Sequence, residues 1–552
     1  MKVYEAMAQA FRDEGTTTLF SLMGDANMYW MATLVADGQV TNVHARHENA
    51  AMAMADGYAR STGSVGVATV TSGPGLAQAM TALVGAARYQ SPVVLFAGDT
   101  QRGDTAALQY IDHEAFGRLC GVHVETVRSA NQALDAVQRA FLRARTLRQT
   151  VMLSVPMDVQ EQLLDEYRYT PSHELGEASG VLVPDQDTLD QALGLIASSR
   201  RPVLIVGTGA VQGDALGPVA ALGDRIGALY ATTLLAKGTF DDSPWGLGVA
   251  GTFSRPQAEK VLGEADLVIG VGASLNRFTR QEGHLFAQAR TIQISHQAAA
   301  EMVQKQPTTL YLRGDAAATV QLLEESLAEA EHTAVGWRER FEREAWDPHD
   351  AAEAGRVEPG EEAMDPRDVV AALERTIPDD AIVVSGAGHF WSFVNKGLTG
   401  RGGRRFLYCL GFGSIGQALP VAVGVAVGHP GRPVVVIDGD SSILMHVAEL
   451  DTAVRAGVDL TAVVLDDDAM GAELHKLRLK QVPDAAALVP TPRLDLVAQG
   501  LGAEGSIVRD QAVLDELLDG HAWTGVTLVD AKVSTSVVDV SAVMGNEVSV
   551  TA

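Results

Sequence analysis

Short apolar runs alternate with helix-like segments along nearly the whole chain, and this alternation restricts the possible folds more than any other feature. The runs are rich in Val, Ile, Leu and Ala and contain few polar positions, as at residues 434–438 and 460–466. Strands of this kind are typical of parallel sheets that are covered by helices on both faces. The alternation therefore predicts an α/β fold with parallel sheets.

Two stretches interrupt the alternation. Residues 165–180 are polar and contain Pro and Gly, and residues 347–366 are rich in Glu, Pro, Gly and Ala. Such compositions favour loops and linkers. A chain of 552 residues is also too long for a single hydrophobic core. We therefore predict three α/β domains, at residues 1–165, 181–335 and 365–552.

The expected elements follow from the position of the apolar runs and from helical spacing of apolar residues between them. We expect strands at residues 17–22, 40–45, 65–70, 93–97, 202–207, 267–271, 291–295, 381–385, 434–438, 460–466 and 526–531. We expect helices at residues 1–15, 49–61, 76–87 and 444–455.

Composition excludes several classes of function. The net charge is −27, with 69 acidic and 42 basic residues, and so acidic a surface repels nucleic-acid backbones. The longest apolar stretches, such as residues 419–428, are about half the ~20 residues needed to cross a bilayer. The two cysteines, Cys120 and Cys409, are far apart, which favours a reducing compartment over a disulfide framework. We expect a cytoplasmic protein without nucleic-acid or membrane partners.

Acidic residues follow two of the expected strands in the third domain. One strand ends in Gly439-Asp440-Ser441, and after 24 residues (442–465) the next ends in Asp466-Asp467. The carboxyl ends of parallel strands meet at one edge of a sheet, where ligands bind in such folds. Two carboxylates and a turn carbonyl suit Mg²⁺, which prefers hard oxygen ligands. The alternative is a helix-capping Asp followed by an unrelated acidic turn.

This pair of segments resembles the cofactor-binding motif of thiamine diphosphate (ThDP) enzymes, in which Gly-Asp-Gly precedes Asn-Asn by some two dozen residues. The resemblance implies that Asp440, Asp467 and the carbonyl of Ala469 hold Mg²⁺ on the diphosphate. Ser441 replaces the usual third glycine. Two aspartates replace Asn-Asn and add negative charge beside an anionic cofactor, and the sequence leaves open whether Asp466 or Asp467 is the better metal ligand.

A second motif lies in the first domain. His47-Glu48 follows a short strand and opens a helix, and Gly73-Pro74-Gly75 follows a later strand. Their order and spacing resemble the pyrimidine-binding domain of the acetolactate synthase group of ThDP enzymes. The resemblance implies that Glu48 hydrogen-bonds N1′ of the aminopyrimidine ring. The alternative is an acidic residue that stabilises a helix N-terminus through the helix dipole.

A third segment, Gly411-Phe-Gly413-Ser-Ile415, precedes an Ala/Val-rich helix. Glycine lets the backbone approach a flat ring closely, although a helix-packing turn would also use it. The resemblance puts the Gly413 carbonyl on the 4′-amino group and Ile415 beneath the folded cofactor. It implies as cofactor-binding residues Gly24, Glu48, Gly73, Gly388, His389, Gly413, Ile415, Gly439, Asp440, Ser441, Ser442, Asp467, Ala469, Met470 and Gly471.

The middle domain carries only a fragment of a dinucleotide fingerprint, Gly207-Thr-Gly209. The corresponding domain binds FAD in true acetolactate synthases and is empty in many of their relatives. FAD is therefore doubtful, and we do not predict it.

The resemblance implies an enzyme that acts on a 2-oxo acid such as pyruvate. ThDP accepts the electrons released when CO₂ leaves, while the protein positions the reactants. The resulting acyl anion either adds to a second carbonyl, in a carboligase, or is protonated to an aldehyde, in a decarboxylase or lyase. Because Glu48 and Asp440 lie in different domains, the family pairs them across subunits, which implies a homodimer or homotetramer.

Residues near the expected substrate site support both alternatives, the carboligase and the decarboxylase. Gln109 lies in a segment that resembles a substrate-contacting segment of acetolactate synthases and favours ligation. Glu473 lies where the pyruvate decarboxylase group has its catalytic acid, and we expect an apolar pocket to raise its pKa. The alternative for Glu473 is a surface ion pair with Lys476 or Arg478.

Two further possibilities remain open. His113 and His475 are candidate acid–base groups, and each is equally well explained as a structural histidine. A ThDP-binding subunit without catalytic activity is a third class of function, but the presence of both Glu48 and Asp440 argues against it.

Overall fold

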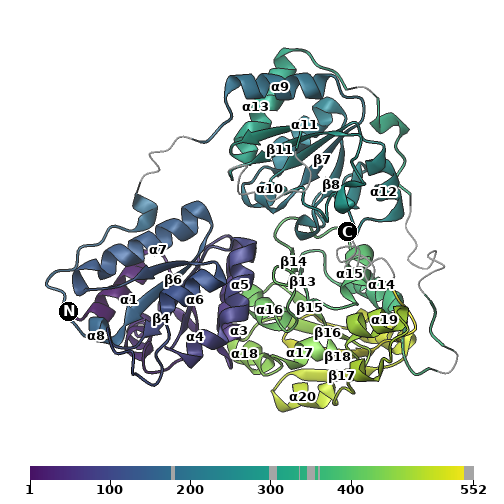
Figure 1. Cartoon of the computed structure of the whole chain (residues 1–552). Helices are drawn as coiled ribbons and strands as arrows, with labels where there is room; N and C mark the ends of the chain where they lie inside the picture. Colours follow the sequence, from purple (N-terminus) through teal and green to yellow (C-terminus); the bar gives the residue numbers. More distant parts are fainter. Residues whose placement is uncertain (176–180, 298–307, 335, 345–354, 359–360, 540–552) are drawn as a thin grey trace.

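The chain forms three parallel sheets of six strands each, with helices on both faces of every sheet (Figure 1). The computed structural model describes residues 1–175, 181–297, 308–334, 336–344, 355–358 and 361–539. The predicted α/β class with three parallel, helix-covered sheets is confirmed. The interruptions expected at 165–180 and 347–366 lie partly outside the described residues.

The first sheet has the strand order β2-β1-β3-β4-β6-β5. Its strands are β1 (Thr18–Ser21), β2 (Thr41–His44), β3 (Gly66–Val70), β4 (Val93–Asp99), β5 (His123–Thr126) and β6 (Thr150–Pro156). Its helices are α1 (Val3–Asp13), α2 (Met28–Val35), α3 (Glu48–Thr62), α4 (Pro74–Gln78), α5 (Met80–Tyr89), α6 (His113–Cys120), α7 (Ala133–Leu147) and α8 (Met157–Gln160).

The middle sheet has the order β12-β11-β10-β7-β8-β9, which is the doubly wound order of nucleotide-binding folds. Its strands are β7 (Pro202–Val206), β8 (Leu229–Thr232), β9 (Gly246–Val249), β10 (Leu267–Val271), β11 (Arg290–Ser295) and β12 (Leu310–Arg313). Its helices are α9 (Gln186–Ala197), α10 (Thr208–Gln212), α11 (Leu216–Ile226), α12 (Pro256–Gly263) and α13 (Ala316–Glu329).

The last sheet has the order β14-β13-β15-β16-β18-β17 and so repeats the connectivity of the first. Its strands are β13 (Ile382–Ser385), β14 (Phe406–Tyr408), β15 (Val434–Gly439), β16 (Leu460–Asp466), β17 (Glu504–Val508) and β18 (Val526–Lys532). Its helices are α14 (Pro366–Thr376), α15 (Trp391–Gly397), α16 (Ala418–Gly428), α17 (Asp440–Leu444), α18 (Glu449–Ala456), α19 (Gly471–Leu479), α20 (Leu494–Gly500) and α21 (Gln511–Asp519).

Two expected helices are each divided into two segments. The helix expected at 76–87 becomes α4 and α5, which meet at Ala79, where ψ is only −4°. The helix expected at 444–455 becomes α17, which begins at Asp440 itself, and α18. The turns between α17 and α18 bring His446 and Glu449 against the start of α3, where Glu449 Oε1 accepts the Arg46 N–H at 2.9 Å.

The first and last domains pack together through α3 and α16 (Figure 1). Glycines make this contact close: a Cβ at Gly57 would lie 2.2 Å from the Val421 carbonyl oxygen, and one at Gly424 would lie 1.9 Å from that of Met54. A single hydrophobic core runs across the contact. The start of α3, which carries Glu48, is thereby fixed relative to the last domain.

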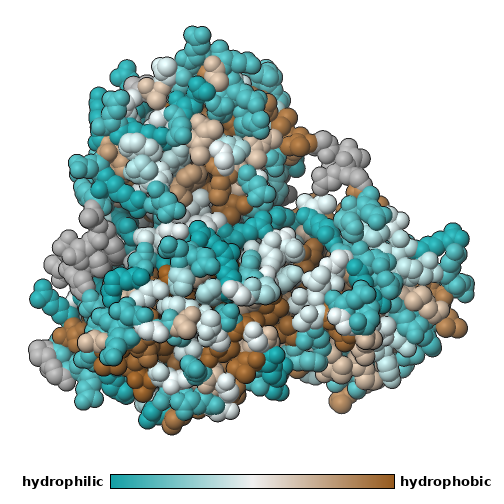
Figure 2. All heavy atoms as spheres, turned by 180° about the vertical axis from the view of Figure 1, so that it is seen from behind, coloured by the Kyte–Doolittle hydropathy of each residue, from teal (hydrophilic) through white to brown (hydrophobic). Residues whose placement is uncertain are grey.

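Apolar side chains also reach the surface. They form brown patches across the lower part of the molecule in Figure 2, which belongs to the first and last domains.

No helix within the described ranges is both long and apolar enough to cross a membrane.

Candidate functional site

The acidic residues of the last domain lie together at one edge of its sheet. Strands β15 and β16 are parallel neighbours whose pairing ends at Gly439 and Leu465. Asp440 starts α17 directly after β15, and Asp467 directly follows β16. The strand-edge geometry thus brings the two acids to the same place, as the spacing suggested.

Asp440 is buried and Asp467 is half-buried, and this shielding from water changes their pKa values. Asp440 is buried, and Oδ2 accepts a hydrogen bond from Thr491 Oγ1 at 2.7 Å. Burial raises the pKa of Asp440 to about 6, and the nearby charge of Asp466 adds to the rise. Burial, followed by the charge of Asp440, raises the pKa of Asp467 to about 8. Two adjacent carboxylates that are shielded from water form an environment that a bound cation stabilises.

Asp466 occupies a different environment. Its carboxylate is buried and pairs with Lys532 Nζ of β18 at 2.5 Å, and it also accepts the Asp468 N–H at 3.0 Å. Asp467 instead faces a cavity at the edge of the sheet. This difference favours Asp467 over Asp466 as a metal ligand.

That cavity, called the C-terminal cavity below, has a volume of about 60 Å³. It is lined by most of the cofactor-binding residues expected in the last domain: Gly388, His389, Ile415, Gly439, Asp440, Ser441, Ser442, Asp467, Ala469, Met470 and Gly471. Glu473 lies at the same wall. Among the described residues, none of those that line the cavity comes from the first or middle domain.

The donor set fits a hard cation only with help from other ligands. No group of three or more His, Cys, Asp and Glu side chains suited to a metal occurs among the described residues. Asp440 and Asp467 would therefore need a backbone carbonyl, such as that of Ala469, together with phosphate oxygens and water to complete six-fold coordination.

Backbone geometry shapes this cavity at Gly471 and the neighbouring segment at Gly413. A Cβ at Gly471 would lie 2.4 Å from Asp467 Oδ2, so a larger residue there would displace the carboxylate. Gly413 has φ +69°, in the left-handed region that favours glycine. Ser442 Oγ accepts the Gly416 N–H at 2.8 Å and so ties the segment with Gly413 and Ile415 to α17.

Two neutral histidines border this site. His389 is buried, and its Nε2 lies 3.0 Å from the Asp539 backbone N–H, which it accepts. Burial, followed by the neighbouring His475, lowers the pKa of His389 to about 3, and burial lowers that of His475 to about 4. The ring centroids are 4.2 Å apart. His389, which lines the cavity, can therefore offer a hydrogen bond to a phosphate but no positive charge.

The expected pyrimidine-binding residues gather around a turn of the first domain, residues 71–75. A Cβ at Gly75 would lie 3.5 Å from Glu48 Oε1, and one at Gly73 would lie 2.3 Å from the Gln109 carbonyl oxygen. Gln109 Oε1 also accepts a hydrogen bond from Ser72 Oγ at 2.7 Å. Gly24 packs on the same turn, since its Cβ would lie 2.6 Å from Thr71. The structure therefore brings Glu48, Gln109, Gly73 and Gly24 together.

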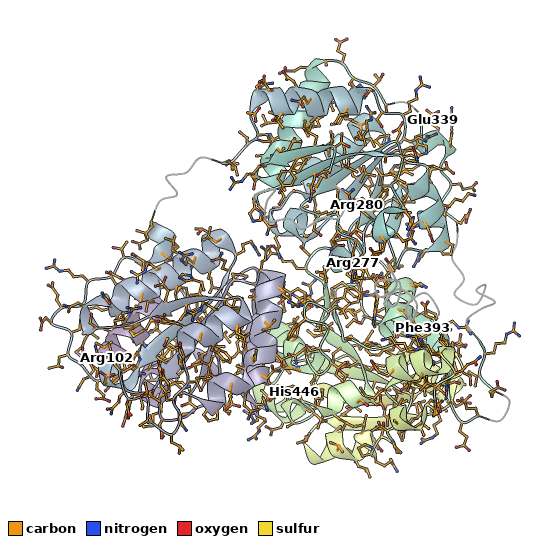
Figure 3. The ribbon with its side chains drawn as sticks, in the orientation of Figure 1. Arg102, Arg277, Arg280, Glu339, Phe393 and His446 are labelled. Atoms are coloured by element: carbon orange, nitrogen blue, oxygen red, sulfur yellow. The ribbon has the colours of Figure 1, made fainter. Side chains whose placement is uncertain are left out.

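His446 lies where α3 meets the last domain (Figure 3). Its ring packs edge-on against His47, at 5.3 Å between centroids, and Nε2 lies 3.3 Å from Asn49 Nδ2. Burial and His47 lower the pKa of His446 to about 4. Gln417 Oε1 accepts a further hydrogen bond from Asn49 at 3.1 Å. No sequence pattern indicated this cluster, because its members come from two domains.

His113 has a structural environment. The ring is buried, Nδ1 lies 2.9 Å from Ser154 Oγ and Nε2 lies 3.4 Å from Asp99 Oδ1. Burial lowers its pKa. His113 contributes to neither the C-terminal cavity nor the larger one described next.

A second cavity, the interdomain cavity, lies where all three domains meet. Gly413, Ile415, Glu473 and Lys476 line it from the last domain. Glu473, in the first turn of α19, lines both cavities, but its side chain is exposed. The expectation that an apolar pocket encloses Glu473 is therefore wrong for the single chain.

The glycine turn of the middle domain also faces the interdomain cavity. A Cβ at Gly207 would lie 2.2 Å from the Gly272 carbonyl oxygen, and one at Gly209 would lie 2.9 Å from Gly272 Cα. Close packing of two backbone segments thus accounts for both glycines without a bound nucleotide.

Thr491 and Lys532 belong to the site and were not expected from the sequence. Lys532 ends β18, beside β16, so the rule that strand ends meet at one sheet edge would have indicated it. Thr491 lies in a loop 51 residues after Asp440 and has no such signal.

Comparison with known proteins gives three matches to family models. Residues 1–117 match the model described as thiamine pyrophosphate enzyme, N-terminal TPP binding domain. Residues 189–323 match the central domain of thiamine pyrophosphate enzymes, and residues 386–531 match their C-terminal TPP binding domain. Thiamine pyrophosphate (TPP) is the same compound as ThDP.

Relatives match over most of their length. The acetolactate synthase large subunit of Parasynechococcus marenigrum (strain WH8102) is 30% identical over 480 residues, which cover 84% of this chain and 76% of that protein. The acetolactate synthase of Arthrospira platensis is 30% identical, with 84% and 82% covered. The sulfoacetaldehyde acetyltransferase of Castellaniella defragrans is 28% identical, with 91% and 88% covered.

Proposed function

Since the chain belongs to the acetolactate synthase-like family of thiamine pyrophosphate enzymes, we propose that it decarboxylates a 2-oxo acid such as pyruvate and transfers the acyl anion to a second carbonyl. The observation that carries this proposal is the meeting of Glu48 and Gln109 at the turn 71–75. Gln109, the residue whose segment resembles that of acetolactate synthases, lies beside the acid proposed to contact the cofactor ring.

The residues of the C-terminal cavity fit ThDP with Mg²⁺. Asp440, Asp467 and the Ala469 carbonyl would hold the cation, and Ser441 and Ser442 would lie beside the diphosphate. When bound, ThDP supplies the nucleophilic carbon and accepts the electrons released with CO₂. Gly413 and Ile415 would position the cofactor rings from the segment that Ser442 holds.

Glu48 has a separate task in this proposal. It would hold a proton between its carboxyl group and N1′ of the pyrimidine ring, at the start of α3. A positioned acid–base group of this kind contributes about 10²–10⁴ in rate.

We also propose that the active site is shared between two copies of the chain. Within the described residues, the C-terminal cavity is lined by the last domain alone, whereas Glu48 and Gln109 gather elsewhere in the same chain. The first domain of a second copy would complete each site, in a homodimer or homotetramer. A cytoplasmic location is consistent with two buried, free cysteines.

A decarboxylase or lyase is the second candidate, and the position of Glu473 favours it. This carboxyl group lines both cavities and would be available to protonate the acyl anion, giving an aldehyde. A non-catalytic subunit is a weaker candidate, since the acids of both motifs are present.

The test is product analysis with the purified protein, ThDP, Mg²⁺ and pyruvate, with and without an acceptor carbonyl. Release of ¹⁴CO₂ and NMR of the products distinguish the candidates. Ligation predicts that hydroxyketone or hydroxy-oxo acid forms in step with CO₂, whereas aldehyde as the sole product with every acceptor would contradict it. If no member of a panel of 2-oxo acids releases CO₂, both enzyme functions are contradicted.

A further inference from the structure

Helix α19 leads from the C-terminal cavity into the interdomain cavity. It begins at Gly471, beside Asp467, and Glu473 in its first turn lines both cavities. Lys476 lines only the interdomain cavity. Residues three apart share a face of a helix, and at 1.5 Å per residue Lys476 lies about 4.5 Å farther along the axis. The two side chains therefore stand in series along the path into the cofactor site.

The Lys476 ammonium has no partner in the part of the chain that the structure describes. No ion pair or side-chain hydrogen bond engages it, and the same holds for Glu473, so the two do not neutralise each other. The next cation of α19, Arg478, is held by Asp484 at 2.8 Å. In a chain of net charge −27, an unpaired cation facing a cavity attracts anionic ligands.

The other charged groups of the interdomain cavity have different surroundings. Arg88 lies 4.6 Å from the ring centroid of Phe412 and donates to the Gly411 carbonyl oxygen at 3.4 Å. Asp315 caps α13 by accepting the Ala318 N–H at 2.9 Å. Arg148 belongs to the first domain and directly follows α7. Lys476 is thus the cation that shares a helix face with Glu473.

The position of Lys476 suits the acceptor rather than the donor. Decarboxylation removes negative charge from the donor carboxylate, and a cation bound there would stabilise the ground state more than the transition state. An anionic group on the acceptor keeps its charge throughout the reaction, so binding it carries no such penalty.

We propose that Lys476 binds an anionic group, a carboxylate or sulfonate, on the acceptor, whose carbonyl then faces Glu473 and the cofactor. This inference rests on the proposed ligation function and narrows its acceptor to short oxo compounds with an oxyacid group near the carbonyl. Lys476 is then a specificity-determining residue.

The test compares matched acceptors with the ThDP- and Mg²⁺-loaded enzyme at a low, fixed pyruvate concentration, because pyruvate is itself a short oxo acid and at saturation would compete for the acceptor site. In Lys476→Met, KM for glyoxylate should rise about 10–100-fold, the effect of losing one hydrogen bond to a charged group. The kcat with glyoxylate and the KM for neutral acetaldehyde should stay within about threefold of wild type. Lys476→Arg should restore most of the affinity for glyoxylate. Lys480→Met is the matched control, because Lys480 is exposed and lines neither cavity.

Two results would overturn the inference: an unchanged KM for glyoxylate in Lys476→Met, or an equal loss with glyoxylate and acetaldehyde. Failure of the proposed ligation would be seen separately, as CO₂ release by the wild type without any ligated product. In that case, inhibition of decarboxylation by glyoxylate tests the role of Lys476. The inhibition constant of glyoxylate should still rise about 10–100-fold in Lys476→Met.

Discussion

Asp466 and Asp467 are adjacent in sequence, but their surroundings give them different roles. Lys532 neutralises Asp466, whereas the buried Asp440 and the half-buried Asp467 both line the C-terminal cavity. The sequence motif alone does not separate the two aspartates, because the residue that distinguishes them comes from β18. Residue-level substitutions therefore test the proposed metal site directly.

Asp467→Asn should retain activity, since an amide oxygen still ligates Mg²⁺ and one buried charge is removed. The same change should raise the melting temperature of the metal-free protein by a few degrees, because it removes a carboxyl group whose charged form is disfavoured first by burial and then by the charge of Asp440. Asp440→Ala should abolish Mg²⁺-dependent ThDP binding. Calorimetric titration of ThDP with and without Mg²⁺ checks both variants. Complete loss of cofactor binding in Asp467→Asn would show that the assigned ligands are wrong.

Glu48→Gln should leave ThDP binding nearly intact while lowering turnover about 10²–10⁴-fold, because the variant cannot exchange a proton with N1′. The informative measurement is the rate at which the C2 proton of bound ThDP exchanges with deuterium, followed by NMR. Glu14 is unsuitable as a control, because it is buried in the first domain and interacts with Arg145 and Ser172. Glu504→Gln, an exposed acid of β17, should leave exchange unchanged. Wild-type exchange in Glu48→Gln would refute its proposed role.

Glu473→Gln separates the two enzyme candidates. If Glu473 passes protons to the reacting carbon or oxygen, the ratio of aldehyde to ligated product should change at least several-fold. The rates at which CO₂, aldehyde and ligated product form are measured separately with pyruvate and an acceptor. If all three rates keep their wild-type values, Glu473 is a surface residue and the decarboxylase candidate loses its supporting observation.

At the scale of elements, regular strands were predictable and local interruptions were not. Runs such as β10 and β16 have the expected bounds because fully buried parallel strands are continuously apolar. The edge strand β5 was missed, since His123 and Glu125 break any apolar run and no residue of it is fully buried. The turn between α17 and α18 was missed because contacts with α3 in another domain stabilise it. The domain boundaries remain predictions.

The same distinction applies to the site. The spacing of the motif predicted that Asp440 and Asp467 lie at one sheet edge, because the carboxyl ends of neighbouring parallel strands lie at the same edge. It did not indicate that Glu473 would be exposed or that His113 would hydrogen-bond Ser154, because burial depends on segments distant in sequence.

The α3–α16 contact gives a prediction about element packing. Gly424→Ala would place a Cβ 1.9 Å from the Met54 carbonyl oxygen, so the helices must separate, at a cost of roughly 1–3 kcal/mol in unfolding free energy. Gly194→Ala is the matched control, because this helical glycine of α9 has nothing within 4 Å of the added Cβ. The control should be stabilised by about 0.5–1 kcal/mol. Denaturant unfolding measures both, and equal effects would show that the close contact does not constrain the helices.

For the whole molecule, the proposal that Glu48 and the C-terminal cavity of one active site come from different copies makes a prediction about assembly. If Glu48 of one copy acts with Asp440 of another, Glu48→Gln and Asp440→Ala are inactive for different reasons. A mixed dimer then contains one doubly altered site and one site with both wild-type residues. Random co-expression makes half of the dimers mixed, each with one intact site, so activity should recover to about a quarter of wild type.

Two tags on the co-expressed chains allow the mixed dimer to be purified, where activity should approach about half of wild type, with one intact site of two. The control is a mixed dimer of Glu48→Gln with Glu48→Gln/Asp440→Ala, in which every site lacks Glu48 and none should recover. Sites built within single chains would give no activity above that of the separate variants. Recovery in the first pair and none in the second would require that each active site draws Glu48 and Asp440 from different copies.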